Sequence, residues 1–482
     1  MLFHGTFVHT PKRGELVILT DTLLAVDETT GRIATLLPGI PRTQLEATIQ
    51  TTQLQQHTLT LLSPTQFILP GFIDTHIHAP QITYAGTGTD VPLMVWLNLY
   101  AFPAEKKFKD VEWARYVYPK LVDRLLRNGT TTALYFGSLH LEANKVLANT
   151  TLNAGQRAFI GKVCIDQNSP DDYIESTENA VRDTEAFIQY CLSLGQRKEE
   201  GLLLTPVVTP RFLPTCSIPL LEQLGQLAKR YDVPIQSHIS ESLDEVAFVQ
   251  QLYGSEISDT EIFDKTGLLT PRTVMAHGVH LNYQDTQTLA QRGTAVAVCP
   301  LSNAYFANGV FPSTRFSYIK QGLGTDIGGG YAPSMLSSIR HLITASRYLA
   351  STAAAAAAAL HGAGADAGVD NSNNHAGVTA AAAAAADLEK GDIIMDWRTG
   401  LYMATRGGAE CLQIQDQVGS FQVGMSFDAI LVDVAVSGTP IDLFPGNDDR
   451  LEDYVEKFIN LGDDRNITNV WVNGQNVLSL SR

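Results

Sequence analysis

The sequence has 482 residues, with 34 Lys and Arg against 50 Asp and Glu, so its formal net charge is −16. Hydrophobic residues make up 44% of the chain and charged residues 17%, which supplies a large core and excludes a wholly disordered chain. The acidic balance argues against nucleic acid as a partner, because polymer binding depends on clustered cations, but it allows a single base in a pocket.

Membrane and secretory classes are also excluded. The N-terminal segment lacks the apolar stretch of a signal peptide, and no run of about 18 apolar residues could span a bilayer. The five cysteines are scattered, odd in number and never spaced as C-x-x-C, which favours a reducing compartment without disulfides or a thiolate zinc site. We therefore expect a cytoplasmic protein that binds no membrane.

Both ends of the chain read as short β segments separated by polar turns. Because two similar ends flank a different middle, we expect a small β-sandwich domain built from residues 1–69 and 411–482. The predicted strands are 16–19, 23–26, 33–37 and 58–62 at the N-terminal end, and 427–434 and 469–472 at the C-terminal end, with a turn and short strand at 419–424.

The middle of the chain, residues 70–410, alternates short apolar runs with longer helical patterns. This alternation is typical of βαβ units, and eight repeats predict a (β/α)₈ barrel. Helices are expected at 111–128, 177–194, 219–231 and 243–253. The predicted strands are 67–78, 131–136, 158–164, 202–209, 234–239, 273–277, 295–299 and 322–326.

One segment does not fit the barrel pattern. Residues 351–387 hold two runs of seven alanines, 353–359 and 380–386, around a stretch rich in Gly, Asn and Asp. Runs this short lack an apolar stripe to bury. We expect a surface insert that lies away from any active site.

Candidate metal ligands stand where predicted strands end. His76 and His78 project from the same face of a strand because they are two residues apart. His238, His277 and Asp326 each end a later apolar strand, at the edge where barrel active sites form. Two or more imidazoles with a carboxylate suit a divalent transition metal, which lowers the pKa of a bound water to about 7.

Glu241 follows His238 by three residues. It could be an exposed acid at a helix start, or a proton shuttle beside the metal site.

Longer motifs allow a family comparison. PGFIDTHIHAPQ, VTPRF, QSHISE, VMAHG and GLGTD resemble the amidohydrolase superfamily. WLNLYAFPAEKKF, NGTTTALYFG, GQRAFIGKVC and LGDDRNI extend the resemblance to its guanine deaminases, from about residue 70 to the C-terminus.

The resemblance implies zinc-dependent hydrolysis of guanine by water, giving xanthine and ammonia. It implies one Zn²⁺ per chain on His76, His78, His238 and Asp326, with Asp326 also deprotonating the water. It further implies that Glu241 carries protons and that His277 orients the substrate. Gln81, Arg211 and Phe212 match positions that grip guanine, and a homodimer is expected. The substrate-binding set is then Gln81, Arg211, Phe212, His238, Glu241, His277 and Asp326.

Two other functions stay open. A related amidohydrolase could act on another amino-heterocycle, such as an oxidised guanine, a triazine or cytosine, with the same metal ligands. Leu301 and the aromatic pair Tyr305-Phe306 depart from the usual family pattern in a loop expected to border the pocket. The chain could also be a non-catalytic scaffold, although a scaffold has no physical need for a complete set of metal ligands.

Overall fold

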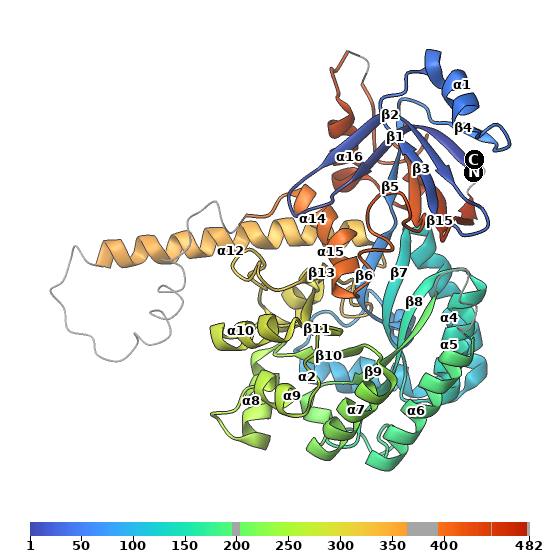
Figure 1. Cartoon of the computed structure of the whole chain (residues 1–482). Coiled ribbons are helices and arrows are strands. Elements are labelled where there is room, and N and C mark those ends of the chain that lie inside the picture. The colour runs from blue at the N-terminus through green and yellow to red at the C-terminus, as the bar shows by residue number, and fades with distance from the viewer. Residues whose placement is uncertain (195–202, 364–393, 445, 480–482) are drawn as a thin grey trace.

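The structure is a computed structural model that describes residues 1–194, 203–363, 394–444 and 446–479, with the backbone alone for 353–363. It contains two β-sheets: a parallel sheet surrounded by helices and a mixed sheet made from both ends of the chain (Figure 1). This arrangement confirms the predicted barrel with a separate small β domain.

The barrel sheet has eight strands paired in the order β13-β12-β11-β10-β9-β8-β7-β6, all parallel. The last seam is bridged by Asp326 N donating to His76 O and His78 N donating to Ile327 O, each at 2.9 Å. The barrel is therefore nearly closed. Its strands are β6 (Phe72–His78), β7 (Thr130–Phe136), β8 (Arg157–Cys164), β9 (Leu204–Pro210), β10 (Ile235–Ile239), β11 (Thr273–His277), β12 (Ala295–Val298) and β13 (Gln321–Leu323).

Helices cover the barrel because each carries an apolar stripe with helical spacing. In α6 (Thr177–Leu194), Ala180, Thr184, Phe187 and Cys191 are buried three or four residues apart. The remaining longer helices are α1 (Arg42–Thr51), α4 (Val111–Arg127), α5 (Leu141–Asn153), α7 (Ile218–Tyr231), α8 (Leu243–Tyr253), α9 (Asp259–Lys265), α10 (Tyr283–Arg292), α12 (Met335–Ala363), α14 (Trp397–Met403), α15 (Arg406–Cys411) and α16 (Leu451–Leu461).

Short helical segments complete the loops at the carboxyl ends of the barrel strands and elsewhere. They are η1 (Ala79–Tyr84), α2 (Leu93–Trp96), η2 (Leu97–Ala101), α3 (Phe102–Lys106), η3 (Lys107–Lys109), η4 (Leu213–Thr215), α11 (Pro300–Ser302), η5 (Asn303–Ala307) and η6 (Asp464–Asn466).

The predicted strand 67–78 is wrong as one element, because it forms two strands in different sheets. β5 (Gln66–Pro70) pairs with β1 and β14, whereas β6 pairs with β7. Gly71 separates them, and a Cβ atom there would lie 2.2 Å from the Thr131 side chain. The apolar run is continuous in sequence, so it conceals the point where the chain changes sheets.

The terminal sheet follows the order β16-β15-β14-β5-β1-β2-β3, with β4 also paired to β1. The predicted strands 16–19 and 23–26 are one strand, β2, and the short strand expected at 419–424 is not formed. Sequence reasoning missed β1 and β16. The strands are β1 (Leu2–His9), β2 (Val17–Val26), β3 (Ile33–Leu37), β4 (Leu59–Leu61), β5, β14 (Ala429–Asp433), β15 (Ile467–Val472) and β16 (Gln475–Ser479).

A buried ion pair joins the two sheets. Arg157 at the start of β8 donates from Nε and Nη2 to the two carboxylate oxygens of Asp428, both at 3.1 Å. Asp428 also accepts from the backbone of Asn473 at 2.8 Å. A bidentate arginine–carboxylate pair fixes orientation as well as distance, so it sets how the terminal sheet sits on the barrel.

The first alanine run continues a helix. α12 extends through 353–359 to Ala363 and projects from the side of the barrel (Figure 1). Residues 364–387 of the predicted insert lie outside the described residues.

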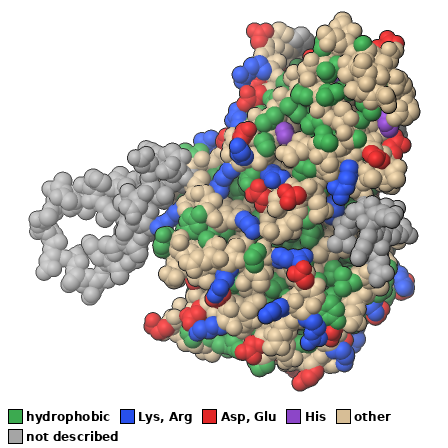
Figure 2. Space-filling view, in the orientation of Figure 1, with side chains coloured by type: hydrophobic (Ala, Val, Ile, Leu, Met, Phe, Trp, Pro, Cys, Tyr) green, Lys and Arg blue, Asp and Glu red, His purple; other side chains and the backbone are tan. Residues whose placement is uncertain are grey.

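The surface agrees with the charge argument. On the face shown in Figure 2, Lys and Arg side chains alternate with Asp and Glu and do not gather into one basic patch. Among the described residues, we find no helix with the length and apolar content needed to cross a bilayer.

Candidate active site

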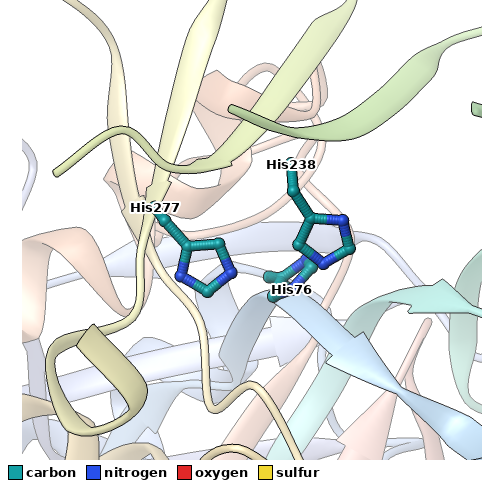
Figure 3. A group of neighbouring side chains, drawn as sticks. All are labelled: His76, His238 and His277. Carbon is teal, nitrogen blue, oxygen red and sulfur yellow. The ribbon is translucent and has the colours of Figure 1, made fainter. Parts of the chain in front are cut away.

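The barrel strands bring the predicted metal ligands together. His76 and His78 lie at the end of β6, His238 in β10 and His277 at the end of β11. Their rings meet at one edge of the barrel, and the His76 ring centroid lies 4.9 Å from that of His238 and 5.2 Å from that of His277 (Figure 3). Four histidines and Asp326, separated by up to 250 positions along the chain, thus form one cluster, as the sequence predicts.

Asp326 faces two sides of this cluster with its two oxygens. Oδ1 lies 3.2 Å from His76 Nε2 and 3.6 Å from His78 Nε2, whereas Oδ2 lies 3.9 Å from His277 Nε2. Asp326 has a φ of 49° and His277 one of 73°, a left-handed backbone that side chains other than glycine rarely adopt. Strain of this kind persists only where the surroundings fix the residue, and it aims both side chains inward.

Backbone and amide acceptors orient two of the imidazoles. His238 Nδ1 donates to Arg211 O at 2.6 Å, and His277 Nδ1 donates to Asn303 Oδ1 at 2.8 Å. Because Nδ1 carries the proton in each case, the Nε2 lone pair faces the cluster. His238 Nε2 and His78 Nε2 lie 3.0 Å apart, so the two nitrogens face the same point of the cluster.

These residues fit a divalent cation. Burial, followed by the charge of neighbouring imidazoles, lowers the pKa of His76, His78 and His238 well below the usual value, which keeps the lone pairs available. His76 Nε2 is buried without a hydrogen-bond partner among the described residues. Ligand atoms of His76, His78 and Asp326 lie within 4.8 Å of one another. Three imidazoles with one carboxylate are a donor set that zinc accepts.

Glu241 lies beside the cluster and is buried. Its Oε2 is 3.6 Å from His277 Nε2, and its backbone N–H donates to Glu245 Oε2 at 2.8 Å. Burial, then the nearby Asp326 carboxylate, raises the pKa of Glu241 well above its usual value. A carboxyl group with a raised pKa can hold a proton near neutrality and pass it on. The exposed helix-start interpretation of Glu241 is thereby excluded.

The predicted recognition residues form a second group in the lining of the same pocket, named the opposite wall for its different chemistry. Gln81 in η1, together with Arg211 and Phe212 after β9, lines the same pocket as His78, His238 and Asp326. Arg211 is buried and is therefore not a surface arginine, whereas Phe212 both packs in a hydrophobic cluster and lines the pocket.

The loop expected to border the pocket does so through one residue. Phe306 in η5 lines the pocket and packs against Trp96 with ring centroids 4.7 Å apart. Leu301 is buried outside the lining, and Tyr305 is 40% exposed. Leu93, Trp96 and Leu97 add further apolar lining that sequence reasoning did not identify.

Sequence reasoning also missed a buried carboxylate behind this wall. Glu105 in α3 accepts from Gln81 Nε2 at 2.8 Å, Tyr173 Oη at 2.7 Å and Arg211 Nη1 at 2.7 Å. Burial opposes the charge on Arg211, but Glu105 and nearby tyrosines outweigh it and raise the arginine pKa. The motif FPAE contains Glu105, yet its Lys-rich surroundings gave no sign of burial.

Comparison with known proteins agrees with this geometry. The amidohydrolase family model matches residues 67–365 and 337–477. The chain is also 37% identical over 482 residues to a guanine deaminase from Dictyostelium discoideum, covering 99% of this chain and 98% of the relative. The chain belongs to the amidohydrolase family.

Solved structures resemble this amidohydrolase along its whole length. A guanine deaminase from C. acetobutylicum with bound guanine has a TM-score of 0.80 and 30% identity, covering 98% of this chain and 99% of that one. An adenosine deaminase from Xanthomonas campestris with bound zinc shares the fold, at a TM-score of 0.74 and 24% identity, covering 99% and 92%. Zinc thus occurs in a protein of this fold, and the described residues of this amidohydrolase include a His/Asp cluster that could hold a metal ion.

Proposed function

We infer that this amidohydrolase hydrolyses guanine to xanthine and ammonia. The observation that carries the inference is a single buried pocket with two walls of different chemistry. One wall gathers three imidazoles, Asp326 and Glu241, and the other presents an arginine, an amide and an aromatic ring. Full-length similarity to guanine deaminases, one of them solved with guanine bound, identifies the heterocycle.

The proposed cofactor is one Zn²⁺ per chain, held by His76, His78, His238 and Asp326. A bound zinc ion supplies Lewis acidity that lowers the pKa of a coordinated water to about 7. The ligands are buried, and the lowered pKa of the imidazoles keeps their lone pairs available to a cation.

The reaction adds the oxygen of water to C2 of guanine and breaks the bond from C2 to the exocyclic nitrogen. Asp326 Oδ2, which lies 3.9 Å from His277 Nε2, accepts the proton of the attacking water. Glu241 donates a proton to the purine ring, making C2 more electrophilic, and protons then pass to the leaving nitrogen, which departs as ammonia. His277 lies between the two carboxylates, 3.6 Å and 3.9 Å from them, and orients the substrate.

Recognition depends on the opposite wall. Arg211 offers donors to acceptor atoms of the purine, and Gln81 offers both a donor and an acceptor. Phe212 supplies an aromatic face on which a purine can stack. A neutral base needs no broad cationic surface, which agrees with a chain of net charge −16.

Steady-state turnover of guanine, followed by the ultraviolet change on conversion to xanthine, tests this function. We expect turnover that a chelator abolishes and added zinc restores, with about one zinc per chain by elemental analysis. A panel of 8-oxoguanine, an aminotriazine and cytosine gives the comparison. No guanine turnover with zinc bound would reject guanine in favour of another heterocycle, and absence of both zinc and turnover would favour a scaffold.

The homodimer and the cytoplasmic location stay predictions. Light scattering of the purified full chain measures the first, and microscopy of a tagged chain measures the second.

A further inference from the structure

Glu105 is a buried carboxylate that stands one layer behind the pocket. Its side chain is 0% exposed and does not contribute to the pocket lining. It nevertheless accepts hydrogen bonds from Gln81 and Arg211, which both line the pocket. Glu105 can therefore influence a ligand through these two side chains without touching it.

The bond to Gln81 decides which way its amide faces. Nε2 donates to Glu105 Oε1 at 2.8 Å, and Oε1 of the amide accepts from Gly328 N at 3.2 Å. Rotating the amide by half a turn would place its oxygen against the Glu105 carboxylate and its NH₂ group against a backbone donor. Both contacts would be repulsive, so Glu105 leaves one orientation.

The bond to Arg211 fixes the plane of the guanidinium. Nη1 lies 3.0 Å and 2.7 Å from the two Glu105 oxygens, and the guanidinium carbon lies 5.2 Å above the Phe102 ring centroid. Within the part of the chain that the structure describes, Nε and Nη2 of Arg211 donate no hydrogen bond. Glu105 thus occupies one nitrogen and leaves the others for a ligand.

We propose that Glu105 is a positioning residue that fixes the donor and acceptor directions of Gln81 and Arg211, and thereby makes the pocket select a purine carbonyl over an amino group. This proposal rests on the proposed function, because it concerns the same pocket and substrate. A guanidinium carries hydrogen-bond donors and no acceptor. When its plane is fixed, it stabilises a carbonyl oxygen and repels an amino group at the same position. A site built from fixed hydrogen-bonding groups rejects a mismatched analogue far more strongly than an adaptable one.

The test compares wild type and Glu105→Gln on two purines. Guanine is the substrate, and 2,6-diaminopurine, which carries an amino group where guanine has its carbonyl, is measured as a competitive inhibitor. We expect the KM for guanine to rise about 10- to 100-fold while kcat stays within about threefold, because binding is lost and the reacting groups are untouched. The preference for guanine, taken as the ratio of inhibition constant to KM, should fall by about tenfold or more.

Two further variants separate positioning from stability. Tyr173→Phe removes the third donor to Glu105 but leaves Gln81 and Arg211 bonded, so KM and preference should stay within about twofold. Glu105→Asp keeps the charge on a shorter side chain, and it should recover part of the guanine preference lost in Glu105→Gln. If Glu105→Gln does not fold, Glu105→Asp is used in its place. A raised KM for guanine at constant kcat then supports the proposal.

The proposal is overturned if KM and the guanine preference of a folded, zinc-loaded Glu105→Gln equal those of wild type. It is also overturned if kcat alone falls, or if Tyr173→Phe loses preference to the same extent, because Glu105 would then serve packing. Absence of guanine turnover by wild type is a different result, since it rejects the proposed function itself.

Discussion

The two walls of the pocket are built in different ways. The metal-facing wall takes its imidazoles from barrel strands, where the hydrogen-bonded sheet fixes each position, and its carboxylates Glu241 and Asp326 from the loops that directly follow β10 and β13. The opposite wall takes its side chains from short helices and loops, including η1, α2 and η5. The barrel strands therefore position the imidazoles of the metal-facing wall. The recognition residues are positioned by side-chain hydrogen bonds, such as the one from Arg211 to Glu105.

Electrostatics differ between the walls as well. Burial keeps the imidazoles of the metal-facing wall neutral, so that a cation can supply the positive charge. The opposite wall contains its own positive charge, Arg211, balanced by Glu105 at 2.7 Å. Removing one partner of such a buried pair leaves an uncompensated charge, which typically costs about 3–5 kcal/mol. Removal of the cation should thus disturb the metal-facing wall, whereas loss of Glu105 or Arg211 should disturb the opposite wall.

The largest effect is expected on the metal-facing wall. Asp326→Asn removes a negative ligand and the base at one stroke, so guanine turnover should fall by at least about 10⁴-fold and zinc content should drop. Elemental analysis and turnover measure both. Asp416→Asn, which changes an exposed carboxylate in the same way, is the control and should match wild type. Turnover at the wild-type rate in Asp326→Asn would show that the metal-facing wall does not carry the reacting groups.

Glu241→Gln should separate proton transfer from cation binding on that same wall. The amide cannot carry the proton, so kcat should fall about 10²- to 10⁴-fold, whereas zinc content should stay at the wild-type value. Stopped-flow turnover and elemental analysis provide the two readouts. The exposed Glu256→Gln serves as the matched control. Turnover at the wild-type rate would contradict the role of Glu241.

The metal-facing wall was the predictable one. His76 and His78 are two residues apart on one apolar strand. His238, His277 and Asp326 each stand at the end of another predicted apolar strand. Because a regular sheet has a fixed geometry, residues at the ends of its strands can be placed in space from the sequence pattern. The error at 67–78 has the same origin, because a continuous apolar run does not show that Gly71 moves the chain from one sheet to another.

The opposite wall could be predicted in part. The family resemblance pointed to Gln81, Arg211 and Phe212, but nothing pointed to Glu105. It lies next to Lys106 and Lys107, so its local sequence is typical of an exposed helix. Its partners are 24, 68 and 106 residues away along the chain, and burial of such a charge becomes visible when those partners converge.

A smaller effect is expected from the apolar part of the opposite wall. Phe306→Ala removes a pocket-lining ring that packs on Trp96, so KM for guanine should rise about 5- to 10-fold with little change in kcat. Tyr305→Ala is the neighbouring control, because that ring is outside the lining and partly exposed. A fall in kcat with constant KM would instead place Phe306 with the chemical groups.

The smallest effect on turnover is expected in the terminal sheet, at His9. His9 Nδ1 lies 2.6 Å from Ser420 Oγ and accepts from Phe421 N at 3.2 Å, so a proton on this nitrogen would oppose the Phe421 N–H donor. Burial lowers the pKa of His9 from 6.5 to about 4. The unfolded chain therefore binds more protons than the folded chain between these values, and stability falls as pH falls through that window.

His9→Asn keeps a hydrogen-bond acceptor near the Phe421 N–H but cannot gain a proton in this window. Between about pH 8 and about pH 5, wild type should lose about 2 kcal/mol of unfolding free energy relative to His9→Asn. Denaturant unfolding of both proteins across this range measures the difference, and the other titrating groups cancel because both chains carry them. Guanine turnover at neutral pH should be equal in the two proteins, since His9 contributes to neither wall. A pH-independent difference in stability would show that folding does not lower the pKa of His9. Unequal turnover would show that a change in the terminal sheet alters the pocket.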